Sequence, residues 1–312
     1  MLLAVLLLTA RIFSPTSAYT LVEDFSGSNF LSGFNFFSGT DPTHGFVRYL
    51  NRADAESQGL ISVSDSSIYI GVDSKHQAAN GRASVRLESK GTYSHGLFIL
   101  DLEHMPGGTC GTWPSFWTYG QDGQWPASGE IDIIEGVHTS TTNGMSLHTT
   151  DGCSVGNSLM AGSVKTPNCY IRAPGQSANT GCLVESSSAE SYGTGFNERG
   201  GGVYAMEWTS TAIRIFFFSR SSLPADIRSS SPDPSTWGTP QANFGGSCDI
   251  DKHFSNHRII LDTTFCGDWA GATWSSTPQC AALAGSCIDY VRDNPADFRE
   301  SYWRIRSLRI YQ

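Results

Sequence analysis

Basic residues are scarce in this chain of 312 residues, which contains 20 Lys and Arg against 29 Asp and Glu and carries a formal net charge of −9. An acidic protein repels the phosphates of nucleic acids and the anionic surface of a membrane. The sequence also contains no basic patch, no glycine-rich phosphate loop and no Rossmann fingerprint. We therefore expect no nucleic-acid partner, no membrane partner and no cofactor, whereas an uncharged partner is compatible with this composition.

Long apolar runs are lacking beyond the amino terminus. An apolar run from Leu2 to Leu8, with no basic residue before it, is followed by Pro15 and by small residues up to Ala18. This pattern is typical of a signal peptide cleaved after Ala18, and the run is too short for a stable membrane anchor. We therefore expect residues 1–18 to be a signal peptide and residues 19–312 to form a soluble, secreted, extracellular protein that acts as a monomer.

No two cysteines have the CxxC spacing of a zinc site, although the chain contains eight cysteines. An even number of cysteines in an exported protein predicts disulfides, here up to four. Their pairing cannot be read from the sequence, but Cys280 and Cys287 are close enough to bracket a short loop. The chain has no Asn-x-Ser/Thr sequon, so we expect no N-glycosylation.

Charged residues make up only 16% of the chain, whereas glycine is abundant at 33 residues, a composition that favours an all-β domain with long ordered loops. Short segments of alternating apolar residues, separated by Gly, Ser and Asn turns, predict two packed antiparallel sheets, that is, a β-sandwich. We expect one helix, at residues 289–302, interrupted by Pro295, and, without repeats or linkers, a single domain over residues 19–312. The alternating segments are 68–72, 85–87, 98–102, 213–217, 259–261 and 303–305.

Residues 152–202 show little alternation and contain Cys153, Cys169 and Cys182. A stretch this long without strands is usually functional or disordered, and the cysteines argue for order. It could form rim loops that close over a cleft or padding over the edge of the sandwich, and the sequence leaves both open.

The most informative stretch is GEIDIIEG at residues 129–136, where three acids interrupt a run of isoleucines. The alternation predicts a β-strand with Glu130 and Asp132 on one face and the isoleucines between them in the core. Glu135 would point to the opposite face of a regular strand, unless one extra residue near positions 133–134 forms a β-bulge. With that bulge, three carboxyls share one surface.

Three carboxyls that converge on a sheet face repel one another, so at least one should have a raised pKa and hold a proton near neutral pH. Two carboxyls about 5 Å apart are the equipment of a retaining glycoside hydrolase, in which one attacks the sugar and the other acts as acid and then as base. The alternatives are an acidic surface strand or a site for a hard cation such as calcium. Three acids among isoleucines favour the catalytic interpretation, and we expect no metal.

GEIDIIEG resembles the active-site signature of glycoside hydrolase family 16, in the longer spacing of its laminarinases (endo-β-1,3-glucanases), and the chain as a whole resembles secreted fungal laminarinases. The resemblance implies a concanavalin-like β-jelly roll with a concave sheet as the substrate cleft. It also implies that Glu130 is the nucleophile, that Asp132 assists it and that Glu135 is the acid/base. The resemblance covers nearly the whole chain after residue 18, through GTWPSFW at 111–117, LHTT at 147–150, YAMEWT at 204–209 and FCGDWAG at 265–271.

Tryptophans are the second chemical signal, because sugar rings present apolar C–H faces that stack on indoles. For any single tryptophan, core packing is the default interpretation. The resemblance implies instead that four of them are stacking platforms around the cleaved bond, namely Trp113, Trp117, Trp125 and Trp269. The other four are expected in the core or at the rim, namely Trp208, Trp237, Trp274 and Trp303.

His148, in LHTT, should lie on the strand next to the acids, where it could hydrogen-bond the acid/base Glu or a sugar hydroxyl. A structural histidine with satisfied hydrogen bonds is the alternative, and the family resemblance favours the site role. Arg86 alternates with the apolar Val85 and Leu87, so it could face the cleft, but we expect it on the solvated surface.

The function favoured by these observations is a secreted, retaining endo-β-1,3-glucanase acting on β-1,3-glucan polysaccharide, with cleavage of mixed 1,3/1,4-β-glucan left open. A transglycosylase on the same fold, using the same acids, is the first alternative. The second is a non-catalytic β-glucan-binding protein, which would need the tryptophans but not the intact set of three acids. A serine hydrolase is disfavoured because the sequence has no GxSxG elbow.

Overall fold

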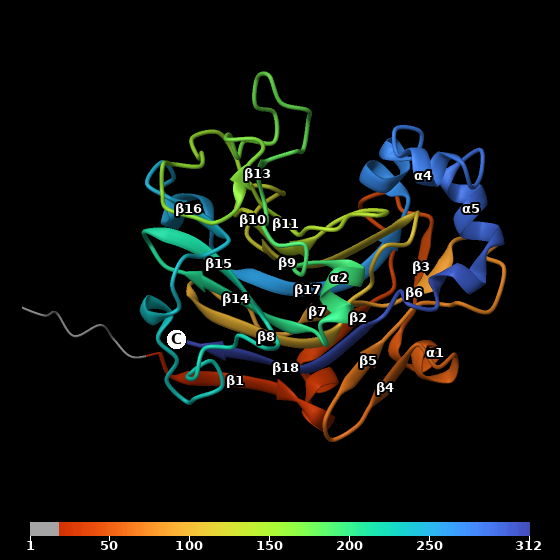
Figure 1. Cartoon of the computed structure of the whole chain (residues 1–312), viewed down its shortest axis with the longest axis horizontal. Coiled ribbons are helices and arrows are strands. Elements are labelled where there is room, and N and C mark those ends of the chain that lie inside the picture. Colours follow the sequence, from red (N-terminus) through yellow and green to blue (C-terminus); the bar gives the residue numbers. More distant parts are fainter. Residues whose placement is uncertain (1–18) are drawn as a thin grey trace, which may run out of the picture.

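The computed structural model describes residues 19–312, so the expected signal peptide lies outside the described residues (Figure 1). Two eight-stranded sheets pack face to face with a hydrophobic core between them. Strand pairing within both sheets is antiparallel, and one short parallel pair, β3 (Val47–Tyr49) with β6 (Arg82–Ser84), stands apart. The sequence-based prediction of an all-β, two-sheet antiparallel sandwich is confirmed.

The first sheet, here called sheet A, lies below in Figure 1 and contains the carboxy-terminal strand near its middle. In spatial order its strands are β16 (Ala242–Gly245), β15 (Ala212–Ser219), β14 (Gly202–Trp208), β8 (Gly96–His104), β18 (Trp303–Tyr311), β5 (Ile68–Ile70) and β4 (Ile61–Val63), and β1 (Leu21–Ser26) also pairs with β18.

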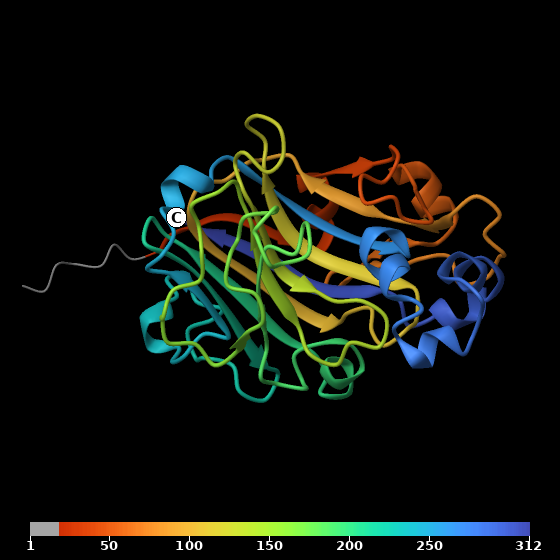
Figure 2. The ribbon, with the colours of Figure 1, turned by 90° about the horizontal axis from the view of Figure 1, so that it is seen from above.

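The second sheet, here called sheet B, carries the acidic motif on a central strand. In spatial order its strands are β12 (Ser163–Val164), β13 (Cys182–Glu185), β11 (Gly144–His148), β10 (Glu130–Glu135), β9 (Thr112–Gly120), β17 (His257–Phe265), β7 (Arg86–Ser89) and β2 (Phe34–Phe37). The strands run diagonally across the molecule when it is seen from above (Figure 2). The six segments of alternating apolar residues each fall on or overlap a strand, as expected.

The outer face of sheet A is covered over β8, β14 and β15 by the segment that follows β15. Ile227 and Trp237 from this segment pack against Ile99, Val203 and Phe216 and form a second, smaller core. Tyr311 at the end of β18 also belongs to this core, whereas the start of β18 and the strands β5 and β4 contribute no residue to it. The sandwich therefore has a closed half and an open half on the side away from the acids.

Helices are short and lie at the ends of strands, with α4 and α5 at one end of the outer face of sheet B (Figure 1). The helix expected at residues 289–302 is in fact α5 (Cys287–Asp293) followed by the 3₁₀ turn η4 (Pro295–Phe298), so its bounds were wrong. Ser286 caps α5 by accepting the amide of Asp289, and Pro295 cannot donate an amide to continue it. The remaining helical elements, too short to show a helical period, are α1 (Arg52–Ser57), α2 (Gly193–Glu198), α3 (Ile250–His253), α4 (Pro278–Ala281), η1 (Gly27–Gly33), η2 (Pro234–Thr236) and the π-helix η3 (Gly267–Gly271).

Four disulfides use all eight cysteines, as the even count predicted. Cys280 and Cys287 do not bracket a loop together, because the fold brings Cys110 and Cys266 next to them. The pairs are Cys110–Cys280, Cys153–Cys248, Cys169–Cys182 and Cys266–Cys287.

The interval of residues 152–202 is ordered, with β12, β13 and α2 and the disulfide Cys169–Cys182. β13 pairs with β11 and so continues sheet B beside the acidic strand. Gly181, just before β13, has φ +62°, and a Cβ there would lie 2.9 Å from the ring of His148. This part of the interval therefore borders the site. Within residues 19–312, no helix is long and apolar enough to cross a membrane.

Candidate active site

The acidic strand β10 contains the bulge that the motif required. Between Asp132 and Ile134 the pairing with β9 advances two residues on β10 for one residue on β9, and the pairing with β11 also shifts before Glu135. Ile133 is the extra residue, and its side chain is buried in the core together with that of Ile134. Because of this extra residue, Glu130, Asp132 and Glu135 all project from the outer face of sheet B.

Asn143 holds the bulge from the loop that precedes β11. Its Oδ1 accepts the amide hydrogen of Glu135 at 2.9 Å, and its Nδ2 donates to the carbonyl of Ile133 at 2.8 Å. The side chain is fully buried, so these main-chain groups are kept from water and need such partners. Sequence reasoning missed Asn143, because only the need of a bulge for main-chain partners points to such a residue.

Asp132 lies at the centre of a buried hydrogen-bonded group. Its Oδ2 accepts from Ser146 Oγ at 2.8 Å and lies 3.0 Å from His148 Nε2. Ser146 and His148 are both on β11, directly opposite Asp132 and Glu130 in the strand register. The expected position of His148 beside the acids is confirmed, but its partner is Asp132 rather than the last glutamate. Ser146 was not recognised from the sequence.

Each glutamate is held by an indole. Trp125 Nε1 donates to Glu130 Oε2 at 2.8 Å, and Trp113 Nε1 donates to Glu135 Oε1 at 2.8 Å. His148 Nε2 is also 3.9 Å from Glu130 Oε1. The two carboxyls therefore have defined orientations with part of each left open toward solvent, since both residues are only half-buried.

Burial and the negative charge of Asp132 raise the pKa of both glutamates. For Glu130 these effects are partly offset by the charge of His148 and the indole of Trp125, and its pKa rises to about 7. The pKa of Glu135 is raised well above its usual range. Both carboxyls therefore hold a proton to a higher pH than an exposed glutamate does.

His148 carries the positive charge in the buried group around Asp132. Burial alone lowers the pKa of His148, but the hydrogen bond to Asp132 and the charges of Asp132 and the two glutamates outweigh it and raise the pKa to about 9. A protonated His148 compensates the charge of buried Asp132.

Glu130, Asp132 and His148 each offer a potential metal-ligand atom, all within 4.8 Å of one another. A protonated imidazole cannot bind a metal, and calcium takes six to eight oxygen ligands. The oxygen Oδ2 of Asp132 is also already used by Ser146 and His148. These donors therefore suit an ion-paired group better than a calcium site.

The four tryptophans assigned to the sugar all lie around the acids. Trp125 is exposed at 41%, and the other three are half-buried. Trp269, on η3, meets Trp113 edge to face with ring centroids 5.7 Å apart, so two indoles stand next to Glu135. Trp117 is partly covered by Arg86, whose Cζ lies 5.1 Å from its ring centroid. The other four tryptophans are buried in the core clusters, as expected: Trp208, Trp237, Trp274 and Trp303.

The expectation that Arg86 is solvated was wrong, since it is buried on the outer face of sheet B. It lies 3.0 Å from Glu88 and 3.8 Å from Asp262, which is opposite Arg86 in the register of β7 and β17. Asp262 also accepts hydrogen bonds from Tyr49 and Trp117, and burial raises its pKa to about 6 although the charge of Arg86 opposes this. The fold brings Asp262 next to Arg86 from a strand that is distant in sequence, and no local sequence pattern shows this pairing.

The site thus combines two carboxyls with raised pKa values, on either side of Asp132, and an indole that donates a hydrogen bond to each of them. A model of the XgeA-like catalytic domain of glycoside hydrolase family 16 matches residues 34–311. An endo-1,3(4)-β-glucanase of Arthroderma benhamiae is 49% identical over 98% of this chain and 68% of its own. A probable endo-1,3(4)-β-glucanase of Aspergillus fumigatus is 46% identical over 98% of this chain, which spans only 48% of that relative.

Solved structures agree with this relationship. Laminarinase 16A from Phanerochaete chrysosporium, with β-glucans in its donor and acceptor sites, is 42% identical with a TM-score of 0.88, over 95% of this chain and 100% of that chain. An elongating family 16 β-1,3-glucosyltransferase is 46% identical with a TM-score of 0.89 over the same shares. The chain therefore belongs to glycoside hydrolase family 16 and has the jelly-roll fold of that family's laminarinases.

Proposed function

We propose that this chain is a secreted, retaining endo-β-1,3-glucanase, that residues 19–312 are its catalytic domain, and that it acts as a monomer. The observation that carries the proposal is the bulge of β10, which places Glu130 and Glu135 on one face on either side of Asp132. Four disulfides support export, because such bonds persist in oxidising compartments. A non-catalytic β-glucan-binding protein would not need all three acids, so their presence argues against that alternative.

In the first step, a carboxylate oxygen of Glu130 attacks the anomeric carbon of the bound glucan. Glu135 gives its proton to the glycosidic oxygen as the bond to the leaving sugar breaks, so the leaving chain departs as a neutral alcohol. The raised pKa of Glu135 supports its role as the acid. Asp132 is held by its contacts with Ser146 and His148. It thereby fixes the part of β10 between the two glutamates, and it assists Glu130.

In the second step, Glu135 is a carboxylate and removes a proton from a water molecule. The water oxygen attacks the anomeric carbon, and the ester bond to Glu130 breaks, so Glu130 returns to its carboxylate. Two inversions at one carbon give a product of the original β configuration. Trp113 keeps Glu135 in place for both proton transfers through its 2.8 Å hydrogen bond.

β-1,3-Glucan is the proposed substrate, since the endo-1,3(4)-β-glucanase of A. benhamiae and laminarinase 16A are 49% and 42% identical to this chain over the aligned residues. Exposed and half-buried indoles around the acids suit the apolar faces of glucose rings. The test is product analysis of the purified mature protein on laminarin, barley mixed-linkage glucan, cellulose and xyloglucan, with proton NMR of the first product. Initial β-anomer and internal cleavage of laminarin are expected, and initial α-anomer or no cleavage would overturn the proposal.

Transglycosylation is a second candidate, favoured by the 46% identity to the elongating β-1,3-glucosyltransferase. The first step is the same, but the hydroxyl of a second glucan replaces water and its proton passes to Glu135. Incubation with a laminari-oligosaccharide of defined length distinguishes the two by mass spectrometry. Products longer than the substrate identify a transferase, and products only shorter than it identify a hydrolase.

A further inference from the structure

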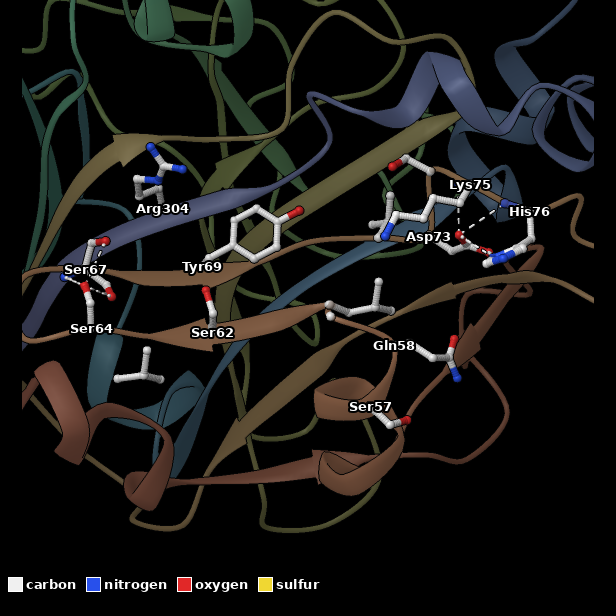
Figure 3. Close-up of a pocket in the computed structure, with 15 residues that line it drawn as sticks. Ser57, Gln58, Ser62, Ser64, Ser67, Tyr69, Asp73, Lys75, His76 and Arg304 are labelled. Carbon is white, nitrogen blue, oxygen red and sulfur yellow. Dashed lines mark hydrogen bonds and ion pairs between the residues drawn. The ribbon is translucent and has the colours of Figure 1, made fainter.

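The open half of the outer face of sheet A contains a hollow of about 800 Å³, on the side of the sandwich away from the acids (Figure 3). Ser62 of β4, Tyr69 of β5 and Arg304 of β18 are neighbours across these strands, so their side chains form one row on this face. Ile68 and Ile70 point the other way, into the core. None of the three acids of β10 lines this hollow.

Tyr69 lies in the middle of the hollow, with its ring flat on the sheet (Figure 3). A Cβ on Gly71 would be 2.3 Å from the Tyr69 hydroxyl and 2.7 Å from its Cζ, so the ring runs along the strand directly over Gly71. Tyr69 is half-buried, so part of its ring remains exposed in the hollow. Tyr302 packs beside it at 5.1 Å between centroids and is itself stacked on His104 at 3.7 Å, which fixes the position of Tyr69 from one side.

Hydrogen-bonding side chains surround this ring. At one end, Ser64 closes the turn between β4 and β5, because its Oγ donates to the Ser67 carbonyl and accepts the Ser67 amide. At the other end, Asp73 accepts the amides of Lys75 and His76 and so orders the loop after β5. Gln58, Ser62 and Arg304 also line the hollow.

The serine hydroxyls and the side-chain amide of Gln58 can both donate and accept hydrogen bonds, as sugar hydroxyls do. An upward aromatic face with such groups at its edges fits a polyhydroxylated ring with an apolar C–H face. Lys75 and Arg304 stand with Asp73 in the lining, so the preference for an uncharged ligand rests on the aromatic ring and on the net charge of −9 of the chain.

We propose that this hollow is a second, non-catalytic binding site for an uncharged β-glucan chain, with one glucose ring stacked on Tyr69. The inference rests on the proposed function for the identity of the polysaccharide. A site on the face opposite the acids holds the enzyme on an insoluble polymer without blocking hydrolysis, and so raises the effective concentration of substrate at the acids.

Binding to insoluble β-1,3-glucan (curdlan) in the Glu130→Gln background tests this, since that background prevents turnover. Tyr69→Ala removes the ring, and Gly71→Ala displaces it without removing it. We expect each to weaken binding by about fivefold or more, the size of one lost aromatic contact. Arg304→Ala removes a side chain of the lining and should also weaken binding. Arg306→Ala is its matched control and should bind like the parent, because Arg306 is exposed on the same strand but is paired with Glu103 and does not line the hollow.

In the active background, the Tyr69 and Gly71 variants should hydrolyse short soluble laminari-oligosaccharides like the parent and lose rate only on curdlan. The proposal is overturned if both variants, with unchanged melting temperature, bind curdlan like the parent. If binding to curdlan is lost in moderate salt, or if the hollow binds a polyanion instead, the proposal of an uncharged ligand is overturned. A parent that neither binds nor cleaves β-glucan refutes the proposed function itself, which is a distinct result.

Discussion

Asn143 fixes the direction of Glu135 through the main chain, with Oδ1 accepting the Glu135 amide at 2.9 Å and Nδ2 donating to the Ile133 carbonyl at 2.8 Å. The bulge interrupts the pairing of β10 with β11 at this point, so the side chain of Asn143 replaces strand contacts. The position of the proposed acid/base therefore depends on a residue outside the acidic motif.

Asn143→Ala should reduce kcat on laminarin by about 10²-fold, because a shift of about 1 Å in a reacting group can cost that much. It should also lower the free energy of unfolding by about 1–3 kcal/mol, since a buried amide and a buried carbonyl lose their partner. Steady-state kinetics and urea denaturation measure the two effects.

Asn197→Ala is the matched control for this variant. Asn197 makes the same double contact with a main chain, accepting from the Met105 amide at 3.0 Å and donating to the Met105 carbonyl at 2.9 Å, but at the end of β8 in the other sheet. We expect a loss of stability without the loss of kcat. Equal losses of kcat in the two variants would mean that Asn143 acts through general stability alone.

His148→Gln should move the pH profile of kcat/KM toward higher pH. Activity requires Glu130 ionised and Glu135 protonated, so it rises through the pKa of Glu130 and falls through that of Glu135. The positive charge of His148 lowers the pKa of both glutamates, and its removal should therefore shift both limbs upward. Initial rates on laminarin across the pH range give the two limbs.

Adding Asp132→Asn to the His148→Gln variant should reverse this shift. The charge of Asp132 raises the pKa of both glutamates, so its loss in a background without the His148 cation lowers them. His95→Gln, with an exposed histidine paired to Asp251, serves as the control and should leave the profile unchanged. A profile that stays fixed in all three variants would refute the electrostatic coupling.

The acidic face could be predicted because its signal is local. Three acids in six residues, alternating with isoleucines, require one extra residue to share a face, and the structure has that bulge at Ile133. The core position of Trp303 was likewise predictable, since Trp303 and Ile305 alternate with exposed arginines along β18.

The supporting residues could not be predicted because their partners are distant in sequence. Asp262 meets Arg86 only after β17 pairs with β7, and Cys110 meets Cys280 across a separation of 170 residues. Arg86 looks like a surface residue beside Val85 and Leu87, and only the tertiary fold adds Asp262 to its sequence neighbour Glu88 as a second carboxylate that makes its burial tolerable.

Glu130→Gln and Glu135→Gln should each lower turnover of laminarin by at least about 10²-fold, because each removes a group required in both steps. Azide should rescue Glu130→Ala as an α-glycosyl azide, by attack from the face that Glu130 leaves open. Azide rescue of Glu135→Ala should give the β-azide, since the ester with Glu130 still forms first. Product NMR identifies the anomer.

Glu185→Gln is the control for these charge changes, because Glu185 is on β13 of the same sheet and is paired with Lys165 at the surface. Its turnover should match that of the parent. Near-parental hydrolysis by both Glu130→Gln and Glu135→Gln would show that the catalytic assignment is wrong.

Trp269→Ala should weaken binding of a β-1,3-oligosaccharide with little loss of stability. Trp269 is half-buried on η3, with its ring edge to face with Trp113, so its remaining surface is available to a sugar. Oligosaccharide affinity in the Glu130→Gln background and the denaturation midpoint measure binding and stability separately.

Trp274→Ala is the matched change five residues later. Trp274 is buried in the core cluster with Phe265 and Val291, and its Nε1 donates to the Ala284 carbonyl at 3.1 Å. Its loss should cost about 3–5 kcal/mol of unfolding free energy by forming a cavity, while the affinity of the folded protein for the oligosaccharide stays close to that of the parent. The two variants therefore predict opposite pairs of results. If Trp269→Ala instead lost stability like Trp274→Ala and kept its affinity, Trp269 would be a structural residue, and sugar recognition near Glu135 would have to come from Trp113.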